Sequence, residues 1–523
     1  MSQKIRLYAL PSCATPKIIV CLVSTWLAAT ATLILWKPPA LTWHDSQRLC
    51  QILLFTIFVA VLFLGQGLYR KITLINRFSG MSISALMLLG ILSALGSRQP
   101  AWALAEVALI TSCLGLAWGI AVARRLSGEI LDQFLIASAA LLSMIKITEF
   151  SVIYFASLAA TEKNIDVFQM LTGFSNPRFY GQFLSLTLPL LAMPLLVRDR
   201  SYRYAILTFV LLALWWTIAI TSGTRGTWLG LLTAISVIFF TGSAGRRWAV
   251  WQAAGALTGL MCFWILLTLI PEWLGVNVQN HAGTRMTTSL SAREVIWLQA
   301  WEMIRERPLL GYGPMHFADI PNPVAAHPHQ AALQWGAEWG VPSLLGVTLL
   351  IAFAAWATLK VLYEHSRSSR PIDLLRLCLS GSLLATLAQA MVDGVIVMPY
   401  TQLWLSILAG WLLALHPSHN ETTTVSQTLR KAWLYACIAS AALLLMISKR
   451  DAANLHEQQL FYTQEVGEFL QPRFWTQGVI ADGIWQKDFP HDPPKSIELS
   501  GGITSPPPPS RGGVSQSRVS PGA

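Results

Sequence analysis

Charged residues are scarce in this chain of 523 residues: they make up 12% of it, whereas hydrophobic residues make up 54%. A soluble globular protein carries roughly 25% charged residues, so the composition excludes an ordinary soluble domain. Long apolar runs replace the missing charge, and many reach the ~20 residues that a helix needs to cross a bilayer. Cysteine is also scarce, with seven residues and no CxxC pair. Neither a disulfide framework nor a thiol-based site is therefore indicated.

Thirteen apolar segments are predicted to cross the membrane as helices, because in lipid every backbone polar group must be paired within its own segment. They are centred near residues 17–36, 51–69, 81–97, 101–122, 130–156, 180–197, 204–222, 226–241, 248–270, 335–360, 374–396, 400–415 and 432–448. The predicted fold class is an all-α polytopic membrane protein with about 12–13 transmembrane helices and one large loop. The first apolar run continues past the cleavage-like triplet Ala29-Thr30-Ala31, so we expect a retained anchor.

Lysine and arginine alternate between the connections, and this alternation predicts the orientation of the chain. Basic clusters such as Arg124-Arg125 and Arg246-Arg247 follow every second span, whereas the opposite short connections are poor in them. We therefore expect the clusters and the N-terminus inside the cell, and the large loop and the C-terminus outside. This pattern explains the net charge of +11 better than a nucleic-acid partner does.

The chain is predicted to have five regions. Residues 1–270 hold nine spans, 271–334 form the large outside loop, 335–448 hold four spans, 449–489 form an outside tail, and 490–523 are Pro-, Gly- and Ser-rich and expected to be disordered. Within the loop, apolar residues recur at helical spacing from Ala292 to Ile304, before Pro308. This spacing predicts an amphipathic helix with Val295, Ile296, Leu298, Trp301 and Ile304 on its apolar side.

Two arginines at the outer ends of spans are candidate anion-binding residues, since a charge at membrane level is costly unless it is used. Arg178 precedes the sixth span, and Arg225 lies between two glycines in the short turn that joins the seventh and eighth spans. A guanidinium offers a five-donor fork for phosphate oxygens. The alternatives are a snorkelling interfacial arginine and an incidental residue of a tight turn. An outside arginine opposes the positive-inside bias, which favours function for Arg225.

The large loop adds further candidates. Arg293 opens the amphipathic helix, where alternating charge is more often a solvated face. His327-Pro328-His329-Gln330 opens the tenth span, and a neutral histidine at the boundary is a natural general base. The two histidines could instead begin a metal site together with His316 or Asp319, or simply cap the helix.

At these residues the sequence resembles the O-antigen ligase superfamily, which includes lipopolysaccharide O-antigen ligases, O-antigen polymerases and bacterial protein O-oligosaccharyltransferases. The likeness runs from about Phe174 to about Trp411. It rests on four ordered pieces: Asn176-Pro177-Arg178 with Leu188-Pro189-Leu190; Ser222-Gly223-Thr224-Arg225-Gly226; Arg293, Trp297 and Pro308-Leu309-Leu310-Gly311-Tyr312-Gly313; and His327-Pro328-His329-Gln330 followed by Glu338-Trp339-Gly340-Val341-Pro342. Gln330 departs from the family's usual Asn. Thirteen spans with an outside C-terminus are more similar to the protein-glycosylating branch than to the lipopolysaccharide ligases.

The resemblance implies a metal-independent, inverting glycosyltransferase without a cofactor, in the bacterial inner membrane. It would move a glycan from undecaprenyl diphosphate to an acceptor hydroxyl on the periplasmic face, either of a lipid A–core sugar or of a pilin-like protein Ser/Thr. His329 is the candidate catalytic base; Arg178, Arg225 and Arg293 are candidate diphosphate-binding residues; and His327 and Glu338 are secondary candidates.

Two alternatives remain, an O-antigen polymerase and a transporter or flippase of lipid-linked glycan. A flippase would use the same basic groups to escort a diphosphate. Such folds usually show internal repeats and polar residues at mid-span. Here we find no repeat and only Lys146 with Glu149 as an intramembrane charged pair, which favours the enzyme.

Overall fold

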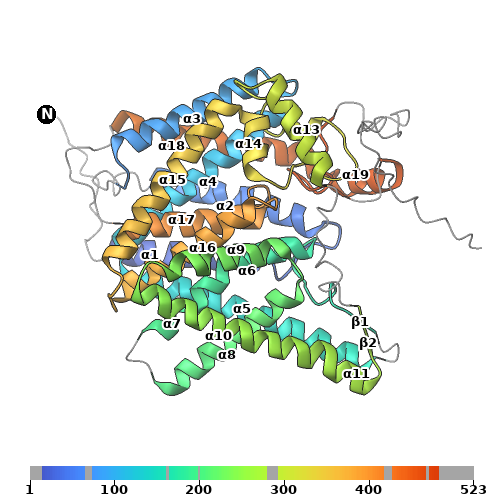
Figure 1. The fold of residues 1–523 in the computed structure, drawn as a ribbon. Coiled ribbons are helices and arrows are strands. Elements are labelled where there is room, and N and C mark those ends of the chain that lie inside the picture. The colour runs from blue at the N-terminus through green and yellow to red at the C-terminus, as the bar shows by residue number, and fades with distance from the viewer. Residues whose placement is uncertain are drawn as a thin grey trace, which may run out of the picture.

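The structure, a computed structural model, describes residues 14–64, 74–160, 164–197, 201–279, 293–416, 427–466 and 470–481, and these are almost entirely helical (Figure 1). The first half comprises α1 (Ala14–Thr32), α2 (Trp43–Leu64), α3 (Arg77–Leu95), α4 (Pro100–Ser127), α5 (Glu129–Ala159), β1 (Asn164–Asp166), α6 (Pro177–Leu191), α7 (Met193–Leu196), α8 (Tyr202–Thr221), α9 (Arg225–Phe239), α10 (Ser243–Trp264), η1 (Ile265–Leu269), α11 (Ile270–Leu274) and β2 (Asn277–Gln279). The second half comprises α13 (Arg293–Glu306), η2 (His316–Asp319), α14 (Ala331–Trp339), α15 (Val341–Glu364), α16 (Pro371–Ala390), α17 (Pro399–Leu415), α18 (Gln427–Asp451), α19 (Leu455–Phe461) and η4 (Tyr462–Val466).

Ten helices in the described ranges are long and apolar enough to cross a membrane. Three shorter apolar helices, Lys17–Thr32, Arg225–Phe239 and Pro399–Leu415, correspond to the other three of the thirteen predicted segments. Two of them pack along longer helices inside the bundle, α9 on α16 and α17 on α4. The predicted fold class, an all-α polytopic membrane protein, is therefore confirmed.

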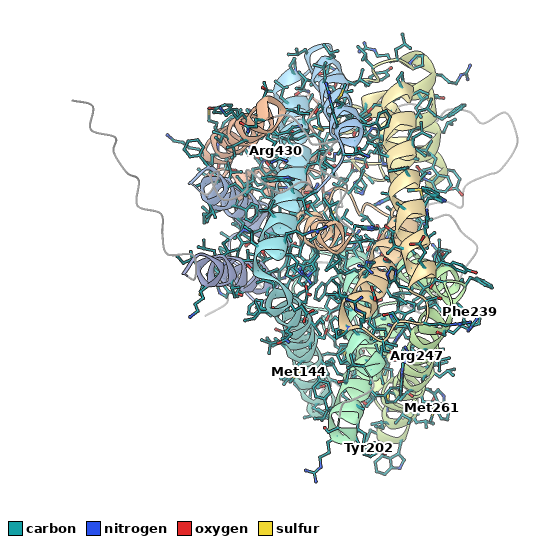
Figure 2. All side chains as sticks on the ribbon, turned by 90° about the vertical axis from the view of Figure 1, so that its left-hand side faces the viewer. Met144, Tyr202, Phe239, Arg247, Met261 and Arg430 are labelled. Carbon is teal, nitrogen blue, oxygen red and sulfur yellow. The ribbon has the colours of Figure 1, made fainter. Side chains whose placement is uncertain are left out.

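The helices differ in how far they are buried inside the bundle. Helix α6 is buried along most of its length and packs on α8, α9, α16 and α17. Helix α15 lies at the periphery and exposes Leu349, Phe353 and Trp356. Met144 and Met261 also project outward from the bundle (Figure 2). In a helix bundle that spans a membrane, apolar side chains face the lipid and polar side chains lie between the helices.

The predicted span at 335–360 is in fact two helices. Helix α14 ends at Trp339 and α15 begins at Val341, with Gly340 between them at φ 83°. A side chain at Gly340 would place its Cβ 2.2 Å from the carbonyl oxygen of Leu309. The break lets α14 turn away from the spanning direction and pack on α13 and α3. The residues that follow His329 therefore belong to a short helix of their own.

The predicted amphipathic helix is present as α13, but its buried face differs from the prediction. Ile296, Ala300, Met303 and Ile304 are buried, whereas Val295 and Trp301 are about half exposed. Packing against the loop and α14 selects this face, which pattern alone could not do. The predicted first residue of the helix, Ala292, lies outside the described residues.

The two ends of the bundle have different character. Helices α13 and α19 and the parallel pair β1–β2 lie along one side of the bundle, the right-hand side in Figure 1, which we call the loop end. The view from the opposite side shows Arg247 and Arg430, from two of the basic connections (Figure 2). The C-terminal residues 470–481 pack at the loop end, where the amide of Ile480 donates to the carbonyl of Ala318 at 3.0 Å. The predicted disordered region 490–523 lies outside the described residues.

Candidate active site

Three helices carry an arginine at their first or second residue. Arg178 is the second residue of α6, and Arg225 and Arg293 are the first residues of α9 and α13. A helix N-terminus carries partial positive charge, so acidic residues stabilise it and basic residues oppose it. An arginine is unfavourable at each of these three helix starts, and such exceptions to local stability are typical of functional sites. Backbone N–H groups and arginines together are well suited to bind an anion.

Glycine allows two of these helix starts to approach each other. A Cβ on Gly181 would lie 2.3 Å from Oγ1 of Thr227 and 2.6 Å from Oγ1 of Thr224. Helices α6 and α9 therefore meet one turn from Arg178 and Arg225. Asn176 caps α6, since its side chain accepts from the backbone N–H of Arg178 at 2.9 Å.

The three arginines act on one another electrostatically although they are far apart in sequence. Burial lowers the pKa of Arg293, and the positive charges of Arg178 and Arg225 lower it further, while Asp393 and Glu294 oppose them. Like charges held this close repel each other. The arrangement is therefore complementary to an anion that carries several negative charges.

His329 lies beside the arginines in a strained backbone conformation, with φ 54°. The side chain is buried, and its Nδ1 lies 3.9 Å from Oδ1 of Asp393. No described residue forms a hydrogen bond with this Nδ1. Trp297 fixes the turn by donating from Nε1 to the carbonyl of Pro328 at 3.0 Å. Strain of this kind in a non-glycine residue concentrates at functional sites.

The charge state of His329 follows from its surroundings. Burial, and then the charges of Arg178 and Arg293, lower the pKa of His329 to about 3. The imidazole is therefore neutral near pH 7, which is the form that accepts a proton.

His327 supports His329 by packing. The two rings meet edge to face with their centroids 4.2 Å apart. A Cβ on Gly394 would lie 2.1 Å from Nε2 of His327, so the ring occupies the space that this glycine leaves. Burial lowers the pKa of His327 well below its usual value, with His329 and Arg473 adding to the shift.

Asp393 belongs to this site, and sequence reasoning missed it. The predicted span at 374–396 contained it, but α16 ends at Ala390 and α17 begins at Pro399, so Asp393 lies in the turn between them. Its carboxylate accepts from the amide of Gly394 at 2.8 Å and from Nε2 of Gln389 at 3.1 Å. Burial raises the pKa of Asp393, and its hydrogen bonds and Arg178 oppose the rise. A carboxylate inside an apolar run was the available signal, because such charges are expensive in lipid.

Gln389 connects Asp393 to the helices that carry the arginines. Its amide accepts from Oγ of Ser185 on α6 at 2.6 Å and contacts Oγ1 of Thr227 on α9 at 3.3 Å. One side chain of α16 thus links α6, α9 and the turn of Asp393.

Glu338 lies in a different cluster from the three arginines. Its Oε2 is 2.7 Å from Nη2 of Arg473, a residue of the C-terminal segment, and its Oε1 accepts from the amide of Phe317 at 3.2 Å. Glu106 of α4 lies 3.4 Å from the same Nη2. The structure thus separates Glu338 from the diphosphate-binding candidates.

The residues suggested as extra metal ligands have other partners. Nε2 of His316 accepts from the amide of Gln99 at 2.9 Å, and Oδ1 of Asp319 accepts from the amide group of Gln99 at 2.7 Å. Within the described ranges, no group of three or more His, Cys, Asp or Glu residues is arranged to hold a metal ion.

An apolar cavity of about 500 Å³ lies between α4 and α14–α17. Glu106, Gln334 and Glu338 are among its polar lining residues. Val395 and Ile396, which follow Asp393 closely, also line it. The cavity is therefore lined in part by the turn that carries Asp393.

Residues 190–348 match the family described as O-antigen ligase. The matched stretch includes Arg225, Arg293 and His329, whereas Arg178 precedes it and Asp393 follows it. No curated protein matches the chain.

Proposed function

We propose that this chain, in which residues 190–348 match the family described as O-antigen ligase, is a membrane glycosyltransferase of the ligase or polymerase type. From this premise we propose that it transfers a glycan from undecaprenyl diphosphate to an acceptor hydroxyl on the periplasmic face of the inner membrane. The observation that carries the proposal is that three arginines at the starts of helices lie within electrostatic range of one another, with His329 beside Arg178 and Arg293. These are the two parts that the reaction needs, an anion clamp and a base.

The arginines would stabilise the leaving diphosphate. As the bond between the anomeric carbon and the phosphate oxygen breaks, its electron pair stays on that oxygen, and negative charge grows there. Fixed donors aimed at developing charge are usually the largest single contribution to catalysis. The isoprenoid chain of the donor would occupy the apolar cavity, whose lining residues Val395 and Ile396 closely follow Asp393 in the chain.

His329 would act on the acceptor. Its Nε2 would take the hydroxyl proton, while the buried Nδ1 faces Asp393. The hydroxyl oxygen attacks the anomeric carbon from the side opposite the diphosphate, so that the configuration inverts. Asp393, with Oδ1 at 3.9 Å, would stabilise the imidazolium that forms. The proton then returns to solvent or to the released diphosphate, and His329 is neutral again. No metal ion or cofactor has a step in this scheme.

The donor would also activate the base. Arg178 and Arg293 both lower the pKa of His329 in the free protein. A bound diphosphate would counter their charge and raise the proton affinity of the imidazole. His329 would thus become a competent base when the donor is in place.

For the acceptor we propose a Ser/Thr of a pilin-like protein, with a lipid A–core sugar as the alternative. The C-terminal segment packs on the large loop, through Gln471 to the carbonyl of Asn322 at 2.9 Å and Ile480 to Ala318. This placement puts residues 470–481 on the same face as the large loop and supports the proposed outside tail, the feature that is more similar to the protein-glycosylating branch.

The test uses the purified protein in detergent with a polyprenyl-diphosphate glycan and separate acceptors: a pilin-like protein, lipid A–core, and the donor alone. We expect glycan on one of the first two, with the anomeric configuration inverted and with full activity after exhaustive chelation. Product from the donor alone would identify a polymerase. A flippase would show no transfer in detergent but would move the donor between leaflets in vesicles, and that pair of results would overturn the proposal.

A further inference from the structure

The segment 470–481, which we call the C-terminal strap, is buried without forming a helix or strand. Arg473, Phe474, Trp475 and Thr476 are each at most 2% exposed. Irregular backbone that is buried must find hydrogen-bond partners outside itself. The strap is therefore held by the rest of the protein, and its partners show what it supports.

Helix α2 binds the backbone of the strap. The guanidinium of Arg48 donates to the carbonyl of Phe474 from Nε at 3.1 Å and to the carbonyl of Arg473 from Nη2 at 3.3 Å. Asp45 accepts from the amide of Thr476 at 2.7 Å. These contacts join the first and last parts of the described chain.

The side chain of Arg473 joins two further helices. Its Nη2 lies 2.7 Å from Oε2 of Glu338 on α14 and 3.4 Å from Oε1 of Glu106 on α4. The amide of Gln334 on α14, turned with its oxygen toward the guanidinium, accepts from Nη1 at 2.5 Å and Nη2 at 3.0 Å. A planar fork can hold several acceptors at once, which a lysine cannot do.

These contacts hold residues close to His329, the proposed base. Helix α14, which carries Glu338 and Gln334, begins two residues after His329. The strap also holds the loop that leads into His327, through Gln471 to Asn322 and Ile480 to Ala318. The charge of Arg473 and the carbonyl of Pro472 both act on His327, in opposite directions.

We propose that the strap forms one wall of the active site and that Arg473 is a positioning residue, which holds the His327–His329 turn through α14. The inference rests on the proposed function for its catalytic part. The physical reason is geometric: a turn strained at His329 keeps its shape only while both of its flanks are fixed.

The experiment compares full-length Arg473→Ala, Arg473→Lys and the double variant Arg473→Met/Glu338→Gln with the wild type. The double variant removes the carboxylate that would otherwise lose its closest partner, so it guards against simple failure to fold. Lys449→Ala, which changes an exposed cation near the end of α18, is the matched control. We measure kcat and KM for the donor, and map the reaction of diethyl pyrocarbonate with each histidine by mass spectrometry.

Wild-type His327 should resist the reagent because it is 1% exposed, while exposed His365 reacts in every variant. In Arg473→Ala and the double variant His327 should react, and kcat should fall roughly 100-fold with KM unchanged, as for a misplacement of about 1 Å. Arg473→Lys should lie between them and the wild type. If His327 stays protected, or kcat stays at the wild-type value in the double variant, the positioning role is wrong. A wild type that transfers no glycan would instead refute the proposed function, while His327 protection still tests the strap.

Discussion

Two clusters of charged residues at the loop end differ in how their charges are paired, one around the buried Arg473 and one around three partly buried arginines. Around Arg473 each positive group meets a carboxylate or amide, with Glu338 and Glu106 on two helices. Around His329 the charges are mostly of one sign: Arg178, Arg225 and Arg293 gather near Asp393. Partnered charge holds a fold together, whereas an excess of one sign costs stability unless a ligand of the other sign binds. The difference distinguishes the structural cluster from the proposed active site.

The largest effect is expected at His329. His329→Ala should lower transfer by roughly 10²–10⁴-fold, the usual contribution of a general base. Donor binding should persist, because the arginines carry it. His329→Gln should be almost as slow, since an amide takes no proton. The measurement is in vitro transfer beside donor binding, with exposed His365→Ala as the control. Wild-type turnover in His329→Gln would make the histidine structural.

Arg225→Ala and Arg178→Ala should separate activity from stability. Losing one preorganised charge at the leaving group should cost about 10²–10³-fold in kcat. The thermal midpoint should stay the same or rise, because like-charge repulsion at the helix starts is relieved. Exposed Arg305→Ala, on α13, is the control. If Arg225→Ala is less stable but its folded fraction has normal specific activity, Arg225 supports the fold and does not bind the diphosphate.

In contrast to the arginine variants, Glu338→Gln should mainly lower the free energy of unfolding. Removing one partner of a buried ion pair typically costs about 3–5 kcal/mol, and we expect the lower end because Glu106 still faces Arg473. Thermal unfolding in detergent measures this loss. Exposed Glu364→Gln on α15 is the control. An unchanged midpoint with abolished donor binding would instead make Glu338 a ligand of the donor.

The smallest effect concerns pH. Because burial and two arginines lower the pKa of His329 to about 3 in the free protein, kcat/KM should decline only in strong acid. A bound diphosphate raises that pKa, so the acid limb of kcat should lie at higher pH than that of kcat/KM. Both profiles come from initial rates across the pH range in which the protein stays folded. Coincident limbs would mean that the donor does not act on the base.

Sequence patterns predicted much of the fold because lipid imposes one simple rule. Every predicted apolar segment corresponds to an apolar helix, since a spanning backbone must satisfy its own hydrogen bonds. The prediction went wrong where packing and not hydropathy decides, at Gly340 and on the buried face of α13. Both depend on neighbours that come from other parts of the chain.

In the candidate site, too, sequence patterns identified some residues and only the packing revealed the others. Its arginines and histidines stood out in sequence because charge is costly beside lipid. Asp393 did not, since it lay within a run that looked continuous, and only the end of α16 at Ala390 reveals its turn. Nothing in the spacing predicted that Arg473 would reach Glu338.

The sequence by itself determined that the helices are apolar enough to lie in lipid, how many such helices there are, and which residue types are available for chemistry. These depend on composition and local periodicity, which each segment carries alone. The tertiary structure decided which charges became partners. Arg293 lies within electrostatic range of Arg178 and Arg225, and Arg473 contacts two carboxylates, because helix packing sets distances between residues far apart in the chain. Electrostatic energy depends on those distances, and a linear sequence does not contain them.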